Sequence, residues 1–133
     1  MNVTVLVHDS VVKLPPEADG AVVIGGSHGA VYAAYMSAKF GCRAAIHHDA
    51  GIGKDEAGVG GLAYAQKLGM AMAAVATASA RIGDGADMMA RGIISRANDL
   101  AARCGFHYDG NCVGNRDQSL VVAADGETSA RAA

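Results

Sequence analysis

A basic residue followed two positions later by glycine stands at the end of three predicted helices of this chain. The three copies are Lys39-Phe40-Gly41, Lys67-Leu68-Gly69 and Arg103-Cys104-Gly105. A cation in the last turn of a helix interacts favourably with the helix dipole, and a glycine just beyond it can adopt the left-handed conformation that ends the helix. Apolar runs follow the first two copies, at 42–46 and 70–76. This order of helix, glycine and strand is typical of a parallel α/β sheet.

The rest of the chain fits the same pattern. We expect further strands at 3–7, 21–24 and 119–124, and helices at 30–40, 59–68, 86–91 and 96–104. Asp84 and Ser95 are suitable N-caps for the last two helices, and residues 128–133 are expected to fray. The connection between the first two strands is too short for a helical crossover, so these strands are either antiparallel neighbours or the first lies at an edge.

A chain of 133 residues is long enough for one domain with its own core. We therefore predict a single α/β domain over residues 1–133. Its expected fold is a three-layer sandwich with a mostly parallel sheet of about five strands, Rossmann-like or flavodoxin-like.

The composition limits the classes of partner that this protein is expected to bind. Charged residues make up only 18% of the chain, below the ~25% typical of soluble domains, so apolar surface is expected to be buried in a homo-oligomer. There is no basic cluster for nucleic acid and no apolar run of the ~18 residues that span a membrane. The first nine residues lack the features of a signal peptide, so we expect a cytoplasmic protein.

Neither the cysteines nor the glycine-rich segments predict a bound cofactor. Cys42, Cys104 and Cys112 are too few for a disulfide framework, and we expect Cys42 and Cys104 in the core. Cys104, His107 and Cys112 are close enough to consider zinc, but their spacing matches no standard ligand pattern, so no metal is predicted. The chain also lacks a convincing dinucleotide fingerprint and a P-loop, although the glycine-rich residues 51–61 are able to wrap a ligand or act as a lid.

The segment Gly25-Gly26-Ser27-His28-Gly29 fits G-x-S-x-G after a predicted strand. This string resembles the nucleophile elbow of the α/β-hydrolases, in which a sharp turn exposes a serine and backbone N–H groups hold an anion. The chain is far shorter than that fold usually requires. Ser27 is therefore either a nucleophile or a group that binds or polarises the substrate, with Gly26 and Gly29 lining the site and His28 beside it.

Polar residues gather where the predicted strands end, which is where open parallel sheets bind ligands. His8 follows the first strand, and His47, His48 and Asp49 follow the third. Adjacent residues of a strand point to opposite faces, so at most one of the two adjacent histidines faces a given pocket. After the fourth strand come Ser79, Arg81 and Asp84, which are candidates for substrate binding together with Lys54. Lys54 is equally consistent with a solvated lysine, and Asp84 with a helix cap.

These residues predict a cofactor-independent enzyme acting on a small, anionic molecule. The leading hypothesis is a hydrolase of an amide, cyclic amide or ester that bears a carboxylate. Ser27 would attack or polarise the carbonyl, a histidine would transfer the proton, Asp49 would orient that histidine, and Arg81 or Lys54 would hold the acid group. A lyase or isomerase using His and Asp without a covalent intermediate is one alternative. A non-catalytic, ligand-binding oligomer is another.

Overall fold

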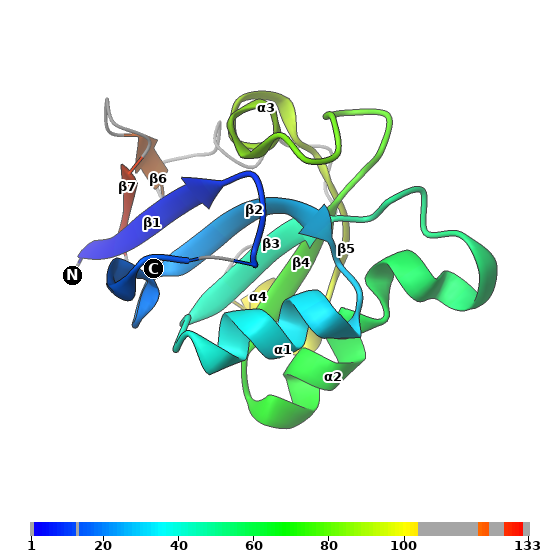
Figure 1. Ribbon diagram of the computed structural model, residues 1–133, viewed down its shortest axis with the longest axis horizontal. Helices are drawn as coiled ribbons and strands as arrows, with labels where there is room; N and C mark the ends of the chain where they lie inside the picture. The colour runs from blue at the N-terminus through cyan, green and yellow to red at the C-terminus, as the bar shows by residue number, and fades with distance from the viewer. Residues whose placement is uncertain (1, 13, 104–119, 123–126, 132–133) are drawn as a thin grey trace.

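The strands form one mixed sheet with helices packed against it (Figure 1). The computed structural model describes residues 2–12, 14–103, 120–122 and 127–131. Its strands are β1 (Asn2–His8), β2 (Val22–His28), β3 (Ala44–His48), β4 (Ala71–Val75), β5 (Ile94–Ala97), β6 (Leu120–Val122) and β7 (Glu127–Arg131). Its helices are the 3-10 helices η1 (Pro16–Ala18) and η2 (Lys54–Val59), and α1 (Val31–Lys39), α2 (Gly61–Leu68), α3 (Gly85–Arg91) and α4 (Asp99–Arg103).

The α/β class predicted from the sequence is confirmed, but the sheet is less parallel than expected. Its strand order is β5-β4-β3-β2-β1-β7-β6. The pairs β1·β2, β2·β3 and β3·β4 are parallel, whereas β4·β5, β1·β7 and β6·β7 are antiparallel. β1 and β2 are thus parallel neighbours, joined by a connection that contains only the short η1.

Two segments differ from the elements expected at the C-terminal end. Residues 128–133 were expected to fray, but 127–131 form β7 and pair with β1. Ser95 was expected to cap a helix over 96–104, but it lies within β5, and the helix begins later, at Asp99. Both differences arise because pairing with a distant strand outweighs the local preference of the segment.

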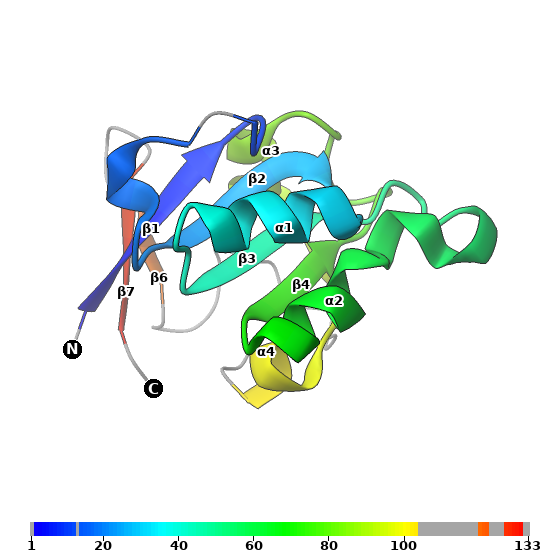
Figure 2. The same ribbon diagram turned by 60° about the horizontal axis from the view of Figure 1, so that its bottom comes forward.

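Buried residues form a cluster on each face of the sheet. Val5 belongs to one cluster and Leu6 to the other, as expected for adjacent residues of a strand. Helices α1 and α2 cover the Leu6 face, where they lie side by side, and α3 packs on the Val5 face (Figures 1 and 2). Within the described residues, no helix is long and apolar enough to cross a membrane.

The loops that follow β1 and β4 meet strand β2 at Gly26. A Cβ atom added at Gly26 would lie 2.6 Å from the Asp84 nitrogen and 2.7 Å from the Asp9 carbonyl oxygen. The Gly26 carbonyl also accepts the Gly83 N–H at 2.8 Å. The close approach of these three backbones brings the carboxyl ends of β1, β2 and β4 together, and the candidate site lies there.

Candidate functional site

Two adjacent cavities open at this end of the sheet. The first, which we call the serine cavity, has a volume of about 390 Å³ and is lined by Asp9, Ser10, Val11, Val12, Gly26, Ser27, His28, Ala30, Tyr32, Ala33, Ile82 and Gly83. The second, the loop cavity, has a volume of about 590 Å³ and is lined by His28, His48, Ala50, Thr77, Ala80, Arg81 and Ile82. His28 and Ile82 line both, so the two cavities meet at these residues.

Ser27 lies in the serine cavity, near the end of strand β2. The strand continues through His28, and helix α1 begins only at Val31, so Ser27 is not at a sharp strand-to-helix turn. Its Oγ accepts the N–H of Val11 at 2.9 Å. Within the described residues, no histidine nitrogen or carboxylate oxygen forms a hydrogen bond with this hydroxyl group. Ser27 is therefore placed to donate its own proton to a ligand, but no base is positioned to activate it.

His28 is the histidine most accessible to a ligand in these cavities. Its side chain is exposed, and its ring nitrogens form no hydrogen bond with the part of the chain that the structure describes. Because it follows Ser27 on β2, it stands at the junction of the two cavities. An imidazole with free nitrogens is able to accept a proton from a ligand or donate one to it.

His47 is directed away from the cavities, towards helix α1. It is fully buried, and its Nε2 lies 3.0 Å from the Oγ of Ser37, which is also fully buried. Burial lowers the pKa of His47 to about 4, although the backbone of Gly25 raises it slightly. The Nδ1 atom has no hydrogen-bond partner in the structure, and a Cβ added at Gly25 would lie 3.1 Å from it. This serine–histidine pair has the distance of a catalytic pair, but a substrate cannot reach it.

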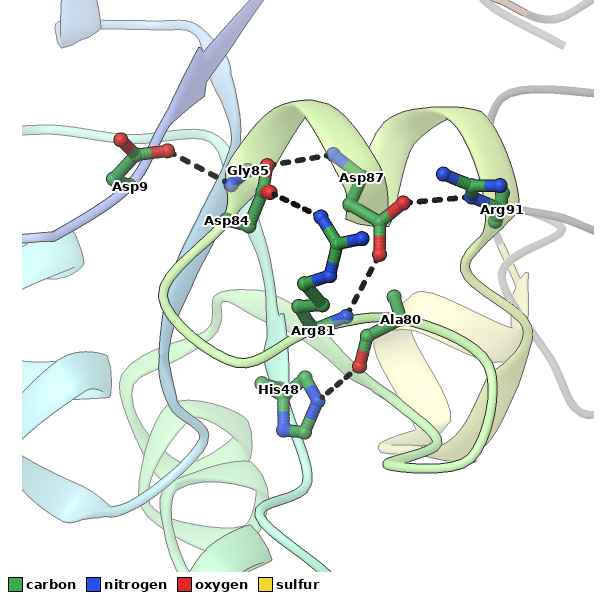
Figure 3. A network of polar contacts seen from close by, with 8 residues as sticks. All are labelled: Asp9, His48, Ala80, Arg81, Asp84, Gly85, Asp87 and Arg91. Carbon is green, nitrogen blue, oxygen red and sulfur yellow. Dashed lines mark hydrogen bonds and ion pairs between the residues drawn. The ribbon is translucent and has the colours of Figure 1, made fainter.

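His48 points to the opposite face of the sheet and joins two loops. Its Nδ1 accepts the N–H of Ala50 at 2.9 Å, so its proton must lie on Nε2. The Nε2–H then donates to the carbonyl of Ala80 at 2.8 Å, as Figure 3 shows. Both ring nitrogens are engaged in this arrangement, and the side chain is only 1% exposed. His48 therefore positions the walls of the loop cavity.

Asp49 holds the ends of three strands together and orients neither adjacent histidine. Its Oδ1 accepts hydrogen bonds from the Gly51 N–H (2.8 Å) and from the N–H and hydroxyl of Thr77 (3.1 and 2.8 Å). Its Oδ2 accepts the hydroxyl of Ser95 at 2.7 Å. Burial alone would raise the pKa of this carboxyl group, but the bonds from Ser95, Thr77 and Gly51 outweigh it and lower the pKa. Asp49 is thus a buried, ionised anchor.

The Arg81 side chain points towards helix α3 and away from His48 (Figure 3). Its guanidinium lies 3.7 Å from the Asp84 carboxylate, and its backbone N–H donates to Asp87 at 2.8 Å. Asp84 caps α3 by accepting the Asp87 N–H at 2.9 Å, as the sequence predicts. Ser79 bonds the backbone of residues 76 and 93. In the structure, these side chains contact other parts of the protein: Arg81 and Asp84 contact each other, Asp84 contacts the first turn of α3, and Ser79 joins residues 76 and 93.

The other predicted positions differ in their access to the cavities. Gly26 lines the serine cavity, while the Gly29 N–H is occupied by the His48 carbonyl at 2.7 Å. His8 is half-buried at the end of β1, and Lys54 is exposed in η2; neither lines either cavity.

Sequence reasoning noted that Asp9, Ser10 and Thr77 follow predicted strands, and considered Asp9 as an alternative to Asp49 for orienting a histidine, but it did not include these cavity-lining residues among the predicted site residues. Ile82 gave no signal, because an apolar side chain in a loop carries no chemistry of its own.

Neither a possible metal site among the described residues nor a similar known protein indicates a function for this chain. Among the described residues, no group of three or more His, Cys, Asp or Glu side chains is placed to hold a metal ion. Cys104, His107 and Cys112 lie outside those residues. Comparisons with models of protein families, with curated protein sequences and with solved structures find no match to this chain.

Proposed function

We propose that this protein is a cofactor-independent enzyme that moves a proton on a small carbonyl compound. The general acid and base is His28, and the carbonyl is polarised by Ser27. One observation carries the proposal: His28 lines both cavities with its ring nitrogens free, while His47 and His48 are buried and engaged in hydrogen bonds.

The chemistry follows from the positions of these two groups. Neutral His28 removes a proton from the carbon next to the carbonyl, and electron density moves onto the carbonyl oxygen. The Ser27 hydroxyl already accepts the Val11 N–H, so its free proton can stabilise that oxygen. The imidazolium then returns the proton to a neighbouring carbon, as in an isomerase, or to a leaving group, as in a lyase.

A hydrolase is the second candidate, because Ser27 and His28 line the same cavity. In that case Ser27 would form a covalent acyl intermediate, which requires a base within hydrogen-bond reach. A fluorophosphonate probe followed by mass spectrometry separates the candidates. We expect no adduct on Ser27, and a stoichiometric adduct would favour the hydrolase.

Proton exchange tests the leading proposal without knowledge of the product. The protein is incubated in deuterated water with a panel of small ketones, aldehydes, amides and esters, and loss of the signal from the proton next to the carbonyl is followed by proton NMR. We expect exchange with at least one class of compound. Failure of every member to exchange faster than in buffer would contradict the proposal.

The roles of the two residues are tested by variants. His28→Gln is expected to reduce exchange by at least ~100-fold, the usual range for loss of a general base. His8→Gln is the matched control, since His8 lies at a neighbouring strand end and lines neither cavity. Equal rates in both variants would remove His28 from the mechanism. Binding without exchange in the wild-type protein would favour a non-catalytic ligand-binding protein.

The cellular and assembly states are part of the same proposal. We infer a cytoplasmic homo-oligomer, supported by the free thiol of Cys42 and by the exposed apolar residues Val31, Tyr32 and Tyr35 on α1. We also infer a three-layer, Rossmann-like arrangement for β1 to β4 and α1 to α3, supported by three parallel strand pairs and buried clusters on both faces. Light scattering during gel filtration tests the oligomer, and a monomer at micromolar concentration would contradict it.

A further inference from the structure

The polar side chains of His48 and Thr77 in the loop cavity are already used within the protein, while Arg81 is exposed at the edge of this cavity. Both ring nitrogens of His48 are hydrogen-bonded, and the Thr77 hydroxyl donates to Asp49. The Arg81 guanidinium is directed to Asp84. Apart from His28, the remaining wall is formed by Ala50, Ala80 and Ile82. This cavity therefore offers a ligand apolar surface and few free hydrogen-bonding groups.

The serine cavity offers free donors instead. Ser27 Oγ accepts the N–H of Val11, and Ser10 Oγ accepts the N–H of Val12 at 3.2 Å. Each hydroxyl therefore keeps its proton for another acceptor, and a hydroxyl that accepts a hydrogen bond becomes a better donor. A carbonyl oxygen is a suitable acceptor for these two groups.

Charge decides between a neutral carbonyl and a carboxylate. Asp9 lines the serine cavity, where its Oδ1 accepts the Gly85 N–H at 3.0 Å. Lys54 lines neither cavity, and Arg81 lines only the loop cavity, so neither cation lies in the serine cavity to compensate a second negative charge beside Asp9. The expected acid group of the substrate has no partner in this arrangement.

We propose that the ligand is a neutral carbonyl compound with an apolar tail, such as an aliphatic amide. This inference rests on the proposed function for its choice of a carbonyl head. The head lies against Ser10 and Ser27, the tail occupies the loop cavity, and the carbons beside the carbonyl pass His28. Ile82 is the residue that determines tail length, because it lines both cavities and is 46% exposed.

The test is a ligand series of graded length. Linear primary amides from acetamide to octanamide are titrated into the protein, and binding is followed by chemical-shift changes in NMR spectra. Affinity is expected to rise about fourfold for each added methylene, the gain typical of burying one such group, until the cavity is filled. The corresponding carboxylates of equal length are expected to bind at least ~10-fold more weakly, a discrimination typical of a mismatched polar head.

Two variants assign the ends of the ligand. Ile82→Ala is expected to weaken octanamide binding at least ~5-fold and acetamide binding much less, because the longer tail buries more apolar surface against it. Leu68→Ala is the matched control, since Leu68 is a similarly exposed residue (52%) on α2, outside both cavities. Ser27→Ala should weaken all amides by a similar factor and leave the gain per methylene unchanged.

Three results would overturn the inference: affinity independent of tail length, carboxylates that bind as well as amides, or equal effects of Ile82→Ala and Leu68→Ala. The proposed function fails separately. If amides bind with the expected length dependence but His28→Gln leaves proton exchange unchanged, the ligand class stands and the catalytic role of His28 falls. If exchange depends on His28 but binding is independent of tail length, the reverse holds.

Discussion

Asp49 contributes to the structure through four hydrogen bonds rather than through catalysis. Each of its carboxylate oxygens accepts, and every partner is a donor. Asp49→Asn would turn one acceptor into an NH2 group that faces donors. We expect the free energy of unfolding to fall by about 2–4 kcal/mol, the cost of leaving buried polar groups unpaired.

Urea unfolding at pH 7 measures this loss. Asp99→Asn is the control, because Asp99 is exposed in the first turn of α4. A loss of under ~0.5 kcal/mol in Asp49→Asn, the usual range for a surface substitution, would show that the carboxylate is not an anchor.

The histidines show which properties of single residues can be predicted from the sequence. The prediction that His47 and His48 face opposite sides of the sheet is confirmed, because strand alternation is fixed by backbone geometry. Their burial was not predictable, since β3 runs through both residues and Ser37 and Ala80 cover them from distant parts of the chain. That the two cavities meet at His28 depends likewise on the 77–84 loop.

At the scale of elements, Gly26 is the point where β2 meets the loops after β1 and β4. The atoms nearest to an added Cβ are backbone atoms of Gly83 and Asp84 at 2.6 Å, and these cannot rotate away as a side chain can. Gly26→Ala should therefore separate the loops, lower the free energy of unfolding by about 1–3 kcal/mol and weaken ligand binding in the serine cavity.

Thermal unfolding and the amide titration described above measure both effects. Gly60→Ala is the matched control, because Gly60 has an ordinary helical conformation. The nearest atom to its added Cβ, the Ala57 carbonyl oxygen, lies at an ordinary contact distance of 3.7 Å. That variant should be neutral or more stable by up to ~1 kcal/mol. If Gly26→Ala behaved like Gly60→Ala, the two loops would not be held as closely to β2 as the structure has them.

Helix ends that depend on one nearby residue were predicted correctly from the sequence. Gly69 has the left-handed conformation expected at the end of α2 (φ 81°), and Asp84 caps α3. Ser95 shows the limit of such signals. A serine before a helical pattern favours an N-cap, yet here its hydroxyl reaches Asp49, and its strand pairs with β4. The residues near Ser95 in the sequence do not predict either contact.

At the scale of the whole molecule, folding lowers the pKa values of two titratable groups, His47 and Asp49, below those of the unfolded chain. His47 is kept neutral by burial under α1, and Asp49 is kept ionised by its hydrogen bonds. Their effects on stability fall in different pH ranges. The dependence of unfolding on pH therefore reports on the packing of each face of the sheet.

His47 changes the free energy of unfolding at mildly acidic pH. The unfolded chain protonates this ring near pH 6.5, whereas the folded protein does so only at about pH 4. Between these values the unfolded state binds more protons, so stability is highest above pH 6.5 and falls as the pH drops, by on the order of 3 kcal/mol. For Asp49 the pKa is lowered, so its contribution is present above pH 3.8 and is lost below it.

Urea unfolding from pH 3 to pH 8 separates the two contributions. His47→Gln should flatten the fall between pH 6.5 and pH 4, even though it lowers stability at neutral pH, because glutamine carries no proton-dependent charge. Asp49→Asn should flatten only the limb below pH 3.8. Glu17→Gln, which removes an exposed carboxylate, is the control for a change in net charge. If His47→Gln kept the wild-type slope between pH 4 and pH 6.5, the buried ring under α1 would not be the group that titrates, and the packing of α1 over β3 would have to be looser than the structure shows.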